Sequence, residues 1–224
     1  MTLLVKKINL GHAEVIIQTT KPHQKSWLDF LNPETLRGNL IRASMFLAAF
    51  EILEDSVISR LRGFMCFEHD ENRHLMDSDH YKDDVLSRHK SRFAASLDWL
   101  IENGTVNLSD KDCAQRIRTH RNLIGHELPK IIASSEHELD ESLFDELYYL
   151  VAKIDRFWIR ELEIPLNSDF DNLDPHEIPD SEIISGNMIF LGMMRDIAIG
   201  EAGVDMYKAS IDALRQSQKT HNVE

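Results

Sequence analysis

The stretch Asn32–Phe67, NPETLRGNLIRASMFLAAFEILEDSVISRLRGFMCF, decides the fold because it predicts one long amphipathic helix. It opens with Asn32 and Pro33, and a capping side chain followed by proline at the first helical position is a start signal. Apolar residues then recur at steps of three and four: Leu36, Leu40, Ala43, Leu47, Phe50, Val57, Leu61 and Phe64. This spacing is typical of a helix with one apolar face. We therefore expect a helix from residue 33 to about residue 67.

Further helices are predicted downstream of a polar connection at residues 68–81. A second helix carries Val85, Leu86, Phe93, Leu97, Leu100 and Ile101, and Asn103-Gly104 stops it. Ser109 or Asp110 can cap a third helix, which we expect to end near Leu128 because Pro129 follows. A fourth helix is expected from about Leu139 to Leu162.

These elements predict an all-α protein, with four segments along the chain. Residues 1–32 stay open, because Leu3–Ile8 and Glu14–Ile17 fit either short strands or loose helix. An antiparallel helical bundle is expected over 33–163, and 164–180 is an acidic linker with three prolines. Residues 181–224 form a C-terminal appendage with two helical stretches, around Ser181–Ile199 and Val204–Gln218, that pack on the bundle or on a partner.

Composition places the chain among globular proteins and excludes some partners. It has 224 residues, 42% hydrophobic content and a formal net charge of −13. That charge argues against broad, non-specific binding to a phosphate backbone, though not against a small site with a local positive field.

No apolar run approaches the ~20 residues that span a bilayer, so no membrane attachment is expected. The opening residues, MTLLVKKINL, do not read as a signal peptide. Cys66 and Cys113 are interpreted as core residues in a reducing compartment, which favours the cytoplasm.

Arg121 interrupts an apolar stripe on the third helix. Ala114, Ile117, Ile124 and Leu128 share one face, and Arg121 falls within the same arc of about 80°. A guanidinium keeps its charge, and burying it unpaired costs several kcal/mol. Arg121 therefore needs an opening to water, a partner or a function. The structural alternatives are a stem on apolar surface with its head in water, or an ion pair with a core carboxylate, for which Glu54 is the candidate.

His126 follows where the helix is expected to weaken. Gly125 and Pro129 both disfavour a regular last turn. A histidine there can titrate near neutral pH and act as a general acid or base. Alone it would be read as a surface residue, so its interest comes from its spacing to Arg121.

The segment Arg121-Asn122-Leu123-Ile124-Gly125-His126 resembles the signature of the HEPN superfamily (higher eukaryotes and prokaryotes nucleotide-binding domains). In that family an arginine is followed after four to six residues by histidine, and the residue after the arginine is usually polar. The arginine, the polar residue and the histidine correspond here to Arg121, Asn122 and His126. The resemblance covers about residues 33–163 and implies a HEPN-like antiparallel bundle.

The resemblance also implies an activity. Many HEPN proteins are metal-independent endoribonucleases whose dimers bring two such motifs into one cleft. Many act as toxins of toxin–antitoxin pairs or in defence against phage, often beside an antitoxin of nucleotidyltransferase type. Others are non-catalytic binding modules, which leaves a scaffold role as the alternative.

The residue types suit RNA cleavage at this motif. A histidine such as His126 can take the proton of the ribose 2′-hydroxyl or return one to the leaving 5′-oxygen. An arginine such as Arg121 can hold the scissile phosphate and stabilise the charge that grows on it. Asn122 can hydrogen-bond the phosphate or orient the histidine. The expected products carry a 2′,3′-cyclic phosphate, and no cofactor is expected.

Basic residues cluster around the motif, namely Lys111, Arg116, Arg118, Arg121 and Lys130. Arg118 lies one turn before Arg121 and is the better candidate for an auxiliary RNA phosphate contact. Arg116 projects elsewhere and is a weaker RNA-binding candidate. His120 lies on a different face from Asn122 and ranks lower.

A metal site is the remaining alternative that we weighed. Four histidines recur among acids in this part of the chain: His69, His74, His80 and His89. Their spacing gives no helical ligand pair and no cysteine joins them, so a solvated cluster is the expectation. No Walker-type loop or dinucleotide fingerprint is present either.

Overall fold

The computed structural model describes residues 3–9, 14–20, 32–133, 140, 142–170 and 173–199. The chain divides into two compact units. Unit 1 comprises Met1–Ser44 and Asn122–Leu139, and unit 2 comprises Met45–Arg121 and Asp140–Glu224. The boundaries cut through two long helices, so the structure does not decide the domain boundaries predicted above.

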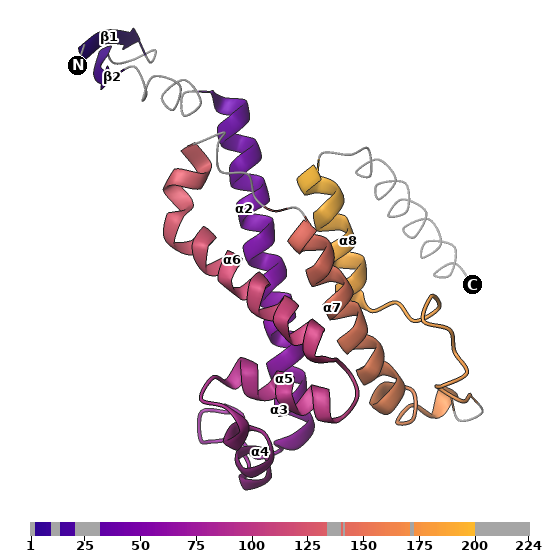
Figure 1. Cartoon of the computed structure of the whole chain (residues 1–224). Helices are drawn as coiled ribbons and strands as arrows, with labels where there is room; N and C mark the ends of the chain where they lie inside the picture. Colours follow the sequence, from indigo (N-terminus) through magenta and orange to yellow (C-terminus); the bar gives the residue numbers. More distant parts are fainter. Residues whose placement is uncertain are drawn as a thin grey trace. The chain divides into compact units, whose positions relative to one another are not determined.

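Within the described residues the protein is mostly helical, which confirms the all-α class at that level (Figure 1). The exception is an N-terminal hairpin of two antiparallel strands, β1 (Leu3–Asn9) and β2 (Glu14–Thr20). Leu3 pairs with Thr20 and Asn9 with Glu14. Of the two readings left open for this segment, the strands are therefore the one observed.

The long helix begins at the expected residue. It consists of α2 (Pro33–Glu54), a π-helical turn η1 (Asp55–Ser59) and α3 (Arg60–Met65). Asn32 accepts a hydrogen bond from the backbone N–H of Glu34 at 3.1 Å, which satisfies one of the free donors of the first turn. The predicted apolar stripe is buried in part within unit 2, where Phe50, Val57 and Leu61 are at most 3% exposed but Phe64 is 41% exposed.

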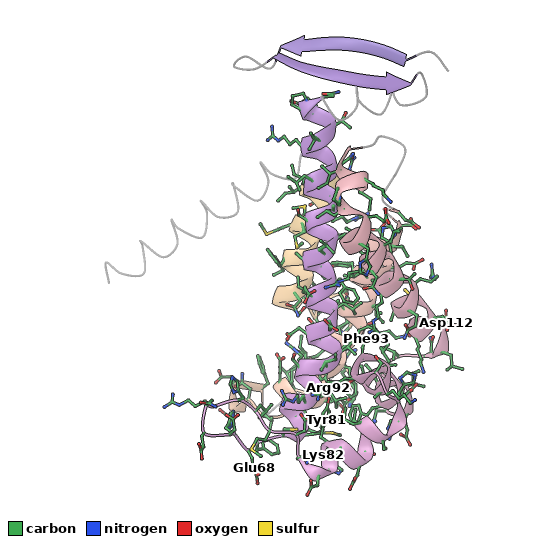
Figure 2. All side chains as sticks on the ribbon, turned by 90° about the vertical axis from the view of Figure 1, so that its left-hand side faces the viewer. Glu68, Tyr81, Lys82, Arg92, Phe93 and Asp112 are labelled. Atoms are coloured by element: carbon green, nitrogen blue, oxygen red, sulfur yellow. The ribbon has the colours of Figure 1, made fainter. Side chains whose placement is uncertain are left out.

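The second predicted helix is broken in two. The chain forms α4 (Asp79–Asp84), the short 3-10 turn η2 (Leu86–Arg88) and α5 (Arg92–Glu102). Helix α4 begins inside the predicted connection, where Ser78 caps it by accepting from Tyr81 N–H at 3.0 Å. The extended backbone of His89 separates η2 from α5. The first turns of α4 and α5 are in contact, because the Arg92 guanidinium lies 5.8 Å from the centre of the Tyr81 ring (Figure 2).

The end of α5 confirms the predicted stop at Asn103-Gly104. Gly104 has φ +73°, a left-handed conformation in which a side chain is strained. Its N–H donates to the carbonyl of Ile101 at 3.0 Å, and the N–H of Thr105 donates to Leu100 at 2.9 Å. This pair of bonds is a Schellman motif, which satisfies carbonyls that the helix end leaves free.

The third predicted helix, α6 (Leu108–Ala133), differs from expectation at both ends. Asn107 is the capping residue rather than Ser109 or Asp110. Its side chain accepts from Asp110 N–H at 3.0 Å, and Asp110 accepts from Asn107 N–H at 2.8 Å. Pro129 lies inside the helix instead of ending it. Within unit 1 the Asn39 amide donates to the carbonyls of Ile131 and Ile132, which the helix end leaves free.

Replacing Asn107 with alanine removes one half of this reciprocal cap. We expect a loss of about 1 kcal/mol in the free energy of unfolding, since the Asp110 N–H would lose its side-chain acceptor. Urea denaturation followed by circular dichroism measures it. Asn107→Asp keeps the acceptor and is expected to stay within a few tenths of a kcal/mol of the wild type. A wild-type midpoint for Asn107→Ala would contradict the assignment.

The fourth helix and the C-terminal appendage belong to unit 2. Helix α7 (Ser142–Trp158) continues as the π-helical turn η3 (Ile159–Glu163). The expected irregular linker follows, with only the 3-10 turn η4 (Ser168–Phe170) in its described part. Helix α8 (Gly186–Ile199) starts later than expected and lies beside α7 (Figure 1). The predicted stretch Val204–Gln218 is outside the described residues.

A buried carboxyl group joins three elements of unit 2. Asp155 on α7 is fully buried and accepts hydrogen bonds from Ser56 Oγ at 3.2 Å, Ser185 Oγ at 2.6 Å and Asn187 Nδ2 at 3.1 Å. Ser185 also caps α8, because its Oγ accepts from Met188 N–H at 3.1 Å. Asp155 therefore links η1, α7 and the start of α8. Among the described residues, no helix is long and apolar enough to cross a membrane.

Candidate functional site

Arg121 lies at the edge of the unit 2 core. Its side chain is 37% exposed, and Nη2 forms an ion pair with Glu51 Oε1 at 3.0 Å. The guanidinium carbon lies 5.5 Å from the centre of the Phe50 ring, in cation–π range. Nε is buried and has no hydrogen-bond partner in the protein. One side of the guanidinium thus packs on apolar surface while the other reaches solvent.

The stripe that singled out Arg121 is buried as expected, since Ala114, Ile117 and Ile124 are 0% exposed. The partner of Arg121 differs from the predicted Glu54. Glu51 lies three residues earlier on α2 and so shares the same side of that helix. Its carboxylate is the one within ion-pair distance. The predicted partner was thus on the correct helix, α2, but the residue was wrong.

Arg118, one turn before Arg121 on α6, also lies against an aromatic ring of unit 2. Its guanidinium lies 5.6 Å from the centre of the Phe93 ring, and Nη1 donates to Ser91 Oγ at 3.1 Å. The Phe50 and Phe93 rings are 6.1 Å apart. We call Phe50, Phe93, Arg118 and Arg121 the arginine–aromatic layer. Sequence reasoning missed its aromatic half, because both phenylalanines were assigned only to core stripes.

Asn122 and His126 belong to unit 1, and both are exposed. Helix α6 is helical at every position from Arg121 to His126, so the expected weakening at Gly125 and Pro129 does not interrupt it. Positions five residues apart on a regular helix point about 140° apart. In one chain the helix therefore directs His126 away from the side of α6 that carries Arg121.

His120 faces the core of unit 2 rather than a solvent site. Its ring packs edge-on against Phe46, with centroids 4.8 Å apart, and Nε2 is buried without a protein partner. Burial lowers the pKa of His120 from its ordinary value of 6.5, and the nearby Asp140 carboxylate opposes this shift. The fold therefore favours the neutral ring.

A pH dependence of stability follows from that lowered pKa. The unfolded chain binds a proton at His120 more readily than the folded chain does. The neutral His120 ring therefore contributes its full share to the free energy of unfolding above about pH 6.5, and this share is lost as the pH falls through the folded-state pKa. We expect His120→Leu to lose less stability than the wild type between about pH 7.5 and about pH 5 in urea titrations. His80→Leu, at an exposed position, serves as the control. Equal losses in wild type and His120→Leu would contradict this reading.

Most of the predicted basic cluster is already paired with carboxylates. Arg116 lies 2.7 Å from Glu146, while Lys111 pairs with Asp98 and Lys130 with Glu127. Arg118 differs, because its hydrogen bond goes to the Ser91 hydroxyl. Among the predicted RNA-binding residues, Arg116 is therefore paired with a carboxylate, whereas Arg118 is bound to a neutral hydroxyl.

The histidine-rich segment gives no metal constellation in the part of the chain that the structure describes. His74 Nδ1 lies 3.3 Å from Asp70, and both side chains are exposed. His69, His80 and His89 are exposed as well.

Comparison of the chain with protein-family models, with curated proteins and with solved structures gave no match.

Proposed function

We propose that the chain is a metal-independent endoribonuclease of HEPN type, with Arg121 and His126 as its catalytic residues. The observation that carries the proposal is the half-exposed guanidinium of Arg121, held in place over Phe50 and beside Glu51. A fixed guanidinium with one open side is suited to binding a phosphate by two parallel hydrogen bonds.

The reaction is cleavage by the substrate's own nucleophile. His126 of one protomer removes the proton of the ribose 2′-hydroxyl, and the 2′-oxygen attacks the adjacent phosphate as the bond to the 5′-oxygen breaks. The protonated His126 of the other protomer gives its proton to the leaving 5′-oxygen. Arg121 stabilises the charge that develops on the phosphate oxygens, and Asn122 assists by hydrogen bonding. The products are a 2′,3′-cyclic phosphate and a 5′-hydroxyl end.

Glu51 is the group that RNA displaces from Arg121. Its side chain is 59% exposed, and an ion pair at such a site contributes only ~0–1 kcal/mol. A phosphate dianion or diester competes with it at modest cost, while the Phe50 stacking stays in place. Arg118, held by Ser91, supplies the next phosphate contact, and Arg116 a weaker one.

The active enzyme is proposed to be a homodimer. On a regular α6 the two catalytic side chains of one chain point in different directions, so a complete site needs an arginine and a histidine from different protomers. Such an enzyme would serve in the cytoplasm as a toxin or a phage-defence component, controlled by an antitoxin of nucleotidyltransferase type.

Cleavage assays on purified protein test the proposal. Single-stranded and structured RNAs, each labelled at one end, are incubated with the full chain in excess EDTA. The expected result is endonucleolytic products that appear at the same rate with and without the chelator. Intact RNA at all protein concentrations, with size-exclusion chromatography showing a dimer, would overturn it.

A non-catalytic binding or scaffold module is the second candidate. The ion pair with Glu51 and the stacking on Phe50 favour it, since both give Arg121 a structural role. Together they are worth roughly 1–2 kcal/mol at a half-exposed site. Under this reading Arg121→Ala lowers the unfolding temperature more than Glu51→Ala does, because it also removes the stacking on Phe50, and expression of the wild type leaves cell growth unchanged. Growth arrest by the wild type and not by His126→Ala would exclude it.

A further inference from the structure

A pocket of about 530 Å³ opens within unit 2, beside α7 and the segment that connects α7 to α8. Its volume lies in the range of ~300–1,000 Å³ typical of small-molecule sites. Its walls include Thr105, Tyr149, Lys153, Arg156, Phe157 and Arg160. It shares no residue with the arginine–aromatic layer.

Helix α7 presents aromatic and basic side chains to this pocket from one face. Tyr149, Lys153, Arg156 and Phe157 fall within an arc of about 100° on a regular helix. Tyr149 is 71% exposed although it is a large aromatic residue. Aromatic rings next to guanidinium and ammonium groups suit a ligand that has both a planar ring and a negative charge.

The acidic side chains of Glu161 and Asp180 line the pocket together with the basic ones. Lys153 is already paired, because Nζ lies 2.6 Å from Asp110 Oδ2, so Arg156 is the basic group that remains for a ligand. Arg160 is held by the connecting segment, since Nη2 lies 2.7 Å from both the Ile178 carbonyl and Asp180 Oδ1. Arg156 has the same carboxylate at 3.9 Å and donates through Nε to the Ile183 carbonyl at 3.4 Å. Asp180, the shared counter-ion, is 65% exposed. An incoming anion can therefore replace Asp180 beside Arg156 without removing a buried pair.

Thr105 provides an independent sign of a ligand. It lines the pocket, it is 5% exposed, and its Oγ1 is buried without a hydrogen-bond partner in the protein. Buried hydroxyls are normally paired. The Schellman turn at Gly104 fixes the backbone of Thr105, so a rotation about the Cα–Cβ bond is enough to turn the hydroxyl toward the pocket.

We propose that this pocket binds a small organic anion with a planar ring, such as a nucleoside monophosphate. The anionic group binds Arg156 in place of Asp180, the ring packs against the aromatic side chains of α7, and a polar atom of the ligand pairs with the Thr105 hydroxyl. This site is separate from the proposed ribonuclease centre and does not depend on it. Nucleoside 5′-monophosphates contain no internucleotide linkage, so their binding is measured without cleavage.

Isothermal titration calorimetry on the full chain tests the proposal with the 5′-monophosphates of adenosine, guanosine, cytidine and uridine. At least one is expected to bind with a dissociation constant of about 1 mM or tighter. Adenosine has the ring without the anionic group, and inorganic phosphate has the anionic group without the ring. Each is expected to bind at least about tenfold more weakly than the nucleotide. Phosphate that binds as tightly as the nucleotides would overturn the assignment of a ring site.

Variants locate the binding within the pocket. Arg156→Gln and Tyr149→Ala are each expected to weaken it at least about tenfold. Arg195→Gln is the matched control, because Arg195 pairs with Asp145 on the surface and does not line the pocket. Thr105→Val keeps the side-chain shape and removes the unpaired hydroxyl, so the unfolding temperature should hold or rise while nucleotide binding weakens severalfold.

Two results would refute the site. One is the absence of heat with all four nucleotides up to about 10 mM. The other is nucleotide binding that Arg156→Gln and Tyr149→Ala both leave at wild-type strength.

Discussion

Replacing His126 with alanine is expected to slow RNA cleavage by about 10²–10⁴-fold, the contribution of one positioned general acid or base. His126 is exposed and makes no hydrogen bond or ion pair with the described residues, so its removal leaves packing intact. Exposed substitutions of this kind change stability by about 0.5 kcal/mol or less. The rate should therefore fall while the unfolding temperature stays at the wild-type value.

Arg121→Ala is expected to slow cleavage by about 10²–10³-fold, as loss of one transition-state hydrogen-bond donor does. Cleavage rates at saturating RNA measure both variants. His80→Ala controls for loss of an exposed histidine. Arg195→Ala controls for loss of an arginine from a surface ion pair, since its 2.7 Å contact with Asp145 resembles that of Arg121 with Glu51. Cleavage that survives both Arg121→Ala and His126→Ala would place the chemistry elsewhere.

Asp155→Ala is expected to cause a large loss of stability, because it removes a buried acceptor that three side chains share. The substitution leaves the Ser56 and Ser185 hydroxyls and the Asn187 amide without their shared acceptor. Each unpaired buried polar group costs ~1–3 kcal/mol, with part recovered by rotation of the hydroxyls. We therefore expect a total loss of about 2–4 kcal/mol and a fall in unfolding temperature of roughly 5–15 °C.

Differential scanning calorimetry measures this effect. Asp155→Asn keeps one carbonyl acceptor and should lose less stability than Asp155→Ala. Asp169→Ala removes an exposed carboxylate and should stay at the wild-type temperature. An unchanged unfolding temperature for Asp155→Ala would show that α8 does not depend on this network.

Periodicity predicted where most helices lie, but not the break before α5 or the exposure of Leu40 and Phe64. The start at Pro33, the buried positions of the α6 stripe and the stop at Gly104 all agree with the structure. Local hydrogen bonds were harder to predict, because Asn107, Ser109 and Asp110 are all good capping residues. Pro129 stays inside α6, a position where proline usually ends or kinks a helix.

The candidate site was predictable only in part, because residues on different helices meet through tertiary packing. Arg121 stood out by its place in the stripe, but its pairing with Glu51 rather than Glu54 depends on how α2 and α6 align within unit 2. The pocket beside α7 was missed altogether. The spacing of Tyr149, Lys153 and Arg156 on one face of α7 was a readable signal, whereas the unpaired Thr105 hydroxyl required the structure.

Identification of the RNA ends is the measurement that tests the central claim most directly. The full chain and the His126→Ala variant are incubated with RNA in excess EDTA, and the 3′ ends are examined by mass spectrometry. The account predicts a 2′,3′-cyclic phosphate with the wild type and uncut RNA with the variant. Products ending in a 3′-hydroxyl, or cyclic ends formed equally by His126→Ala, would contradict it.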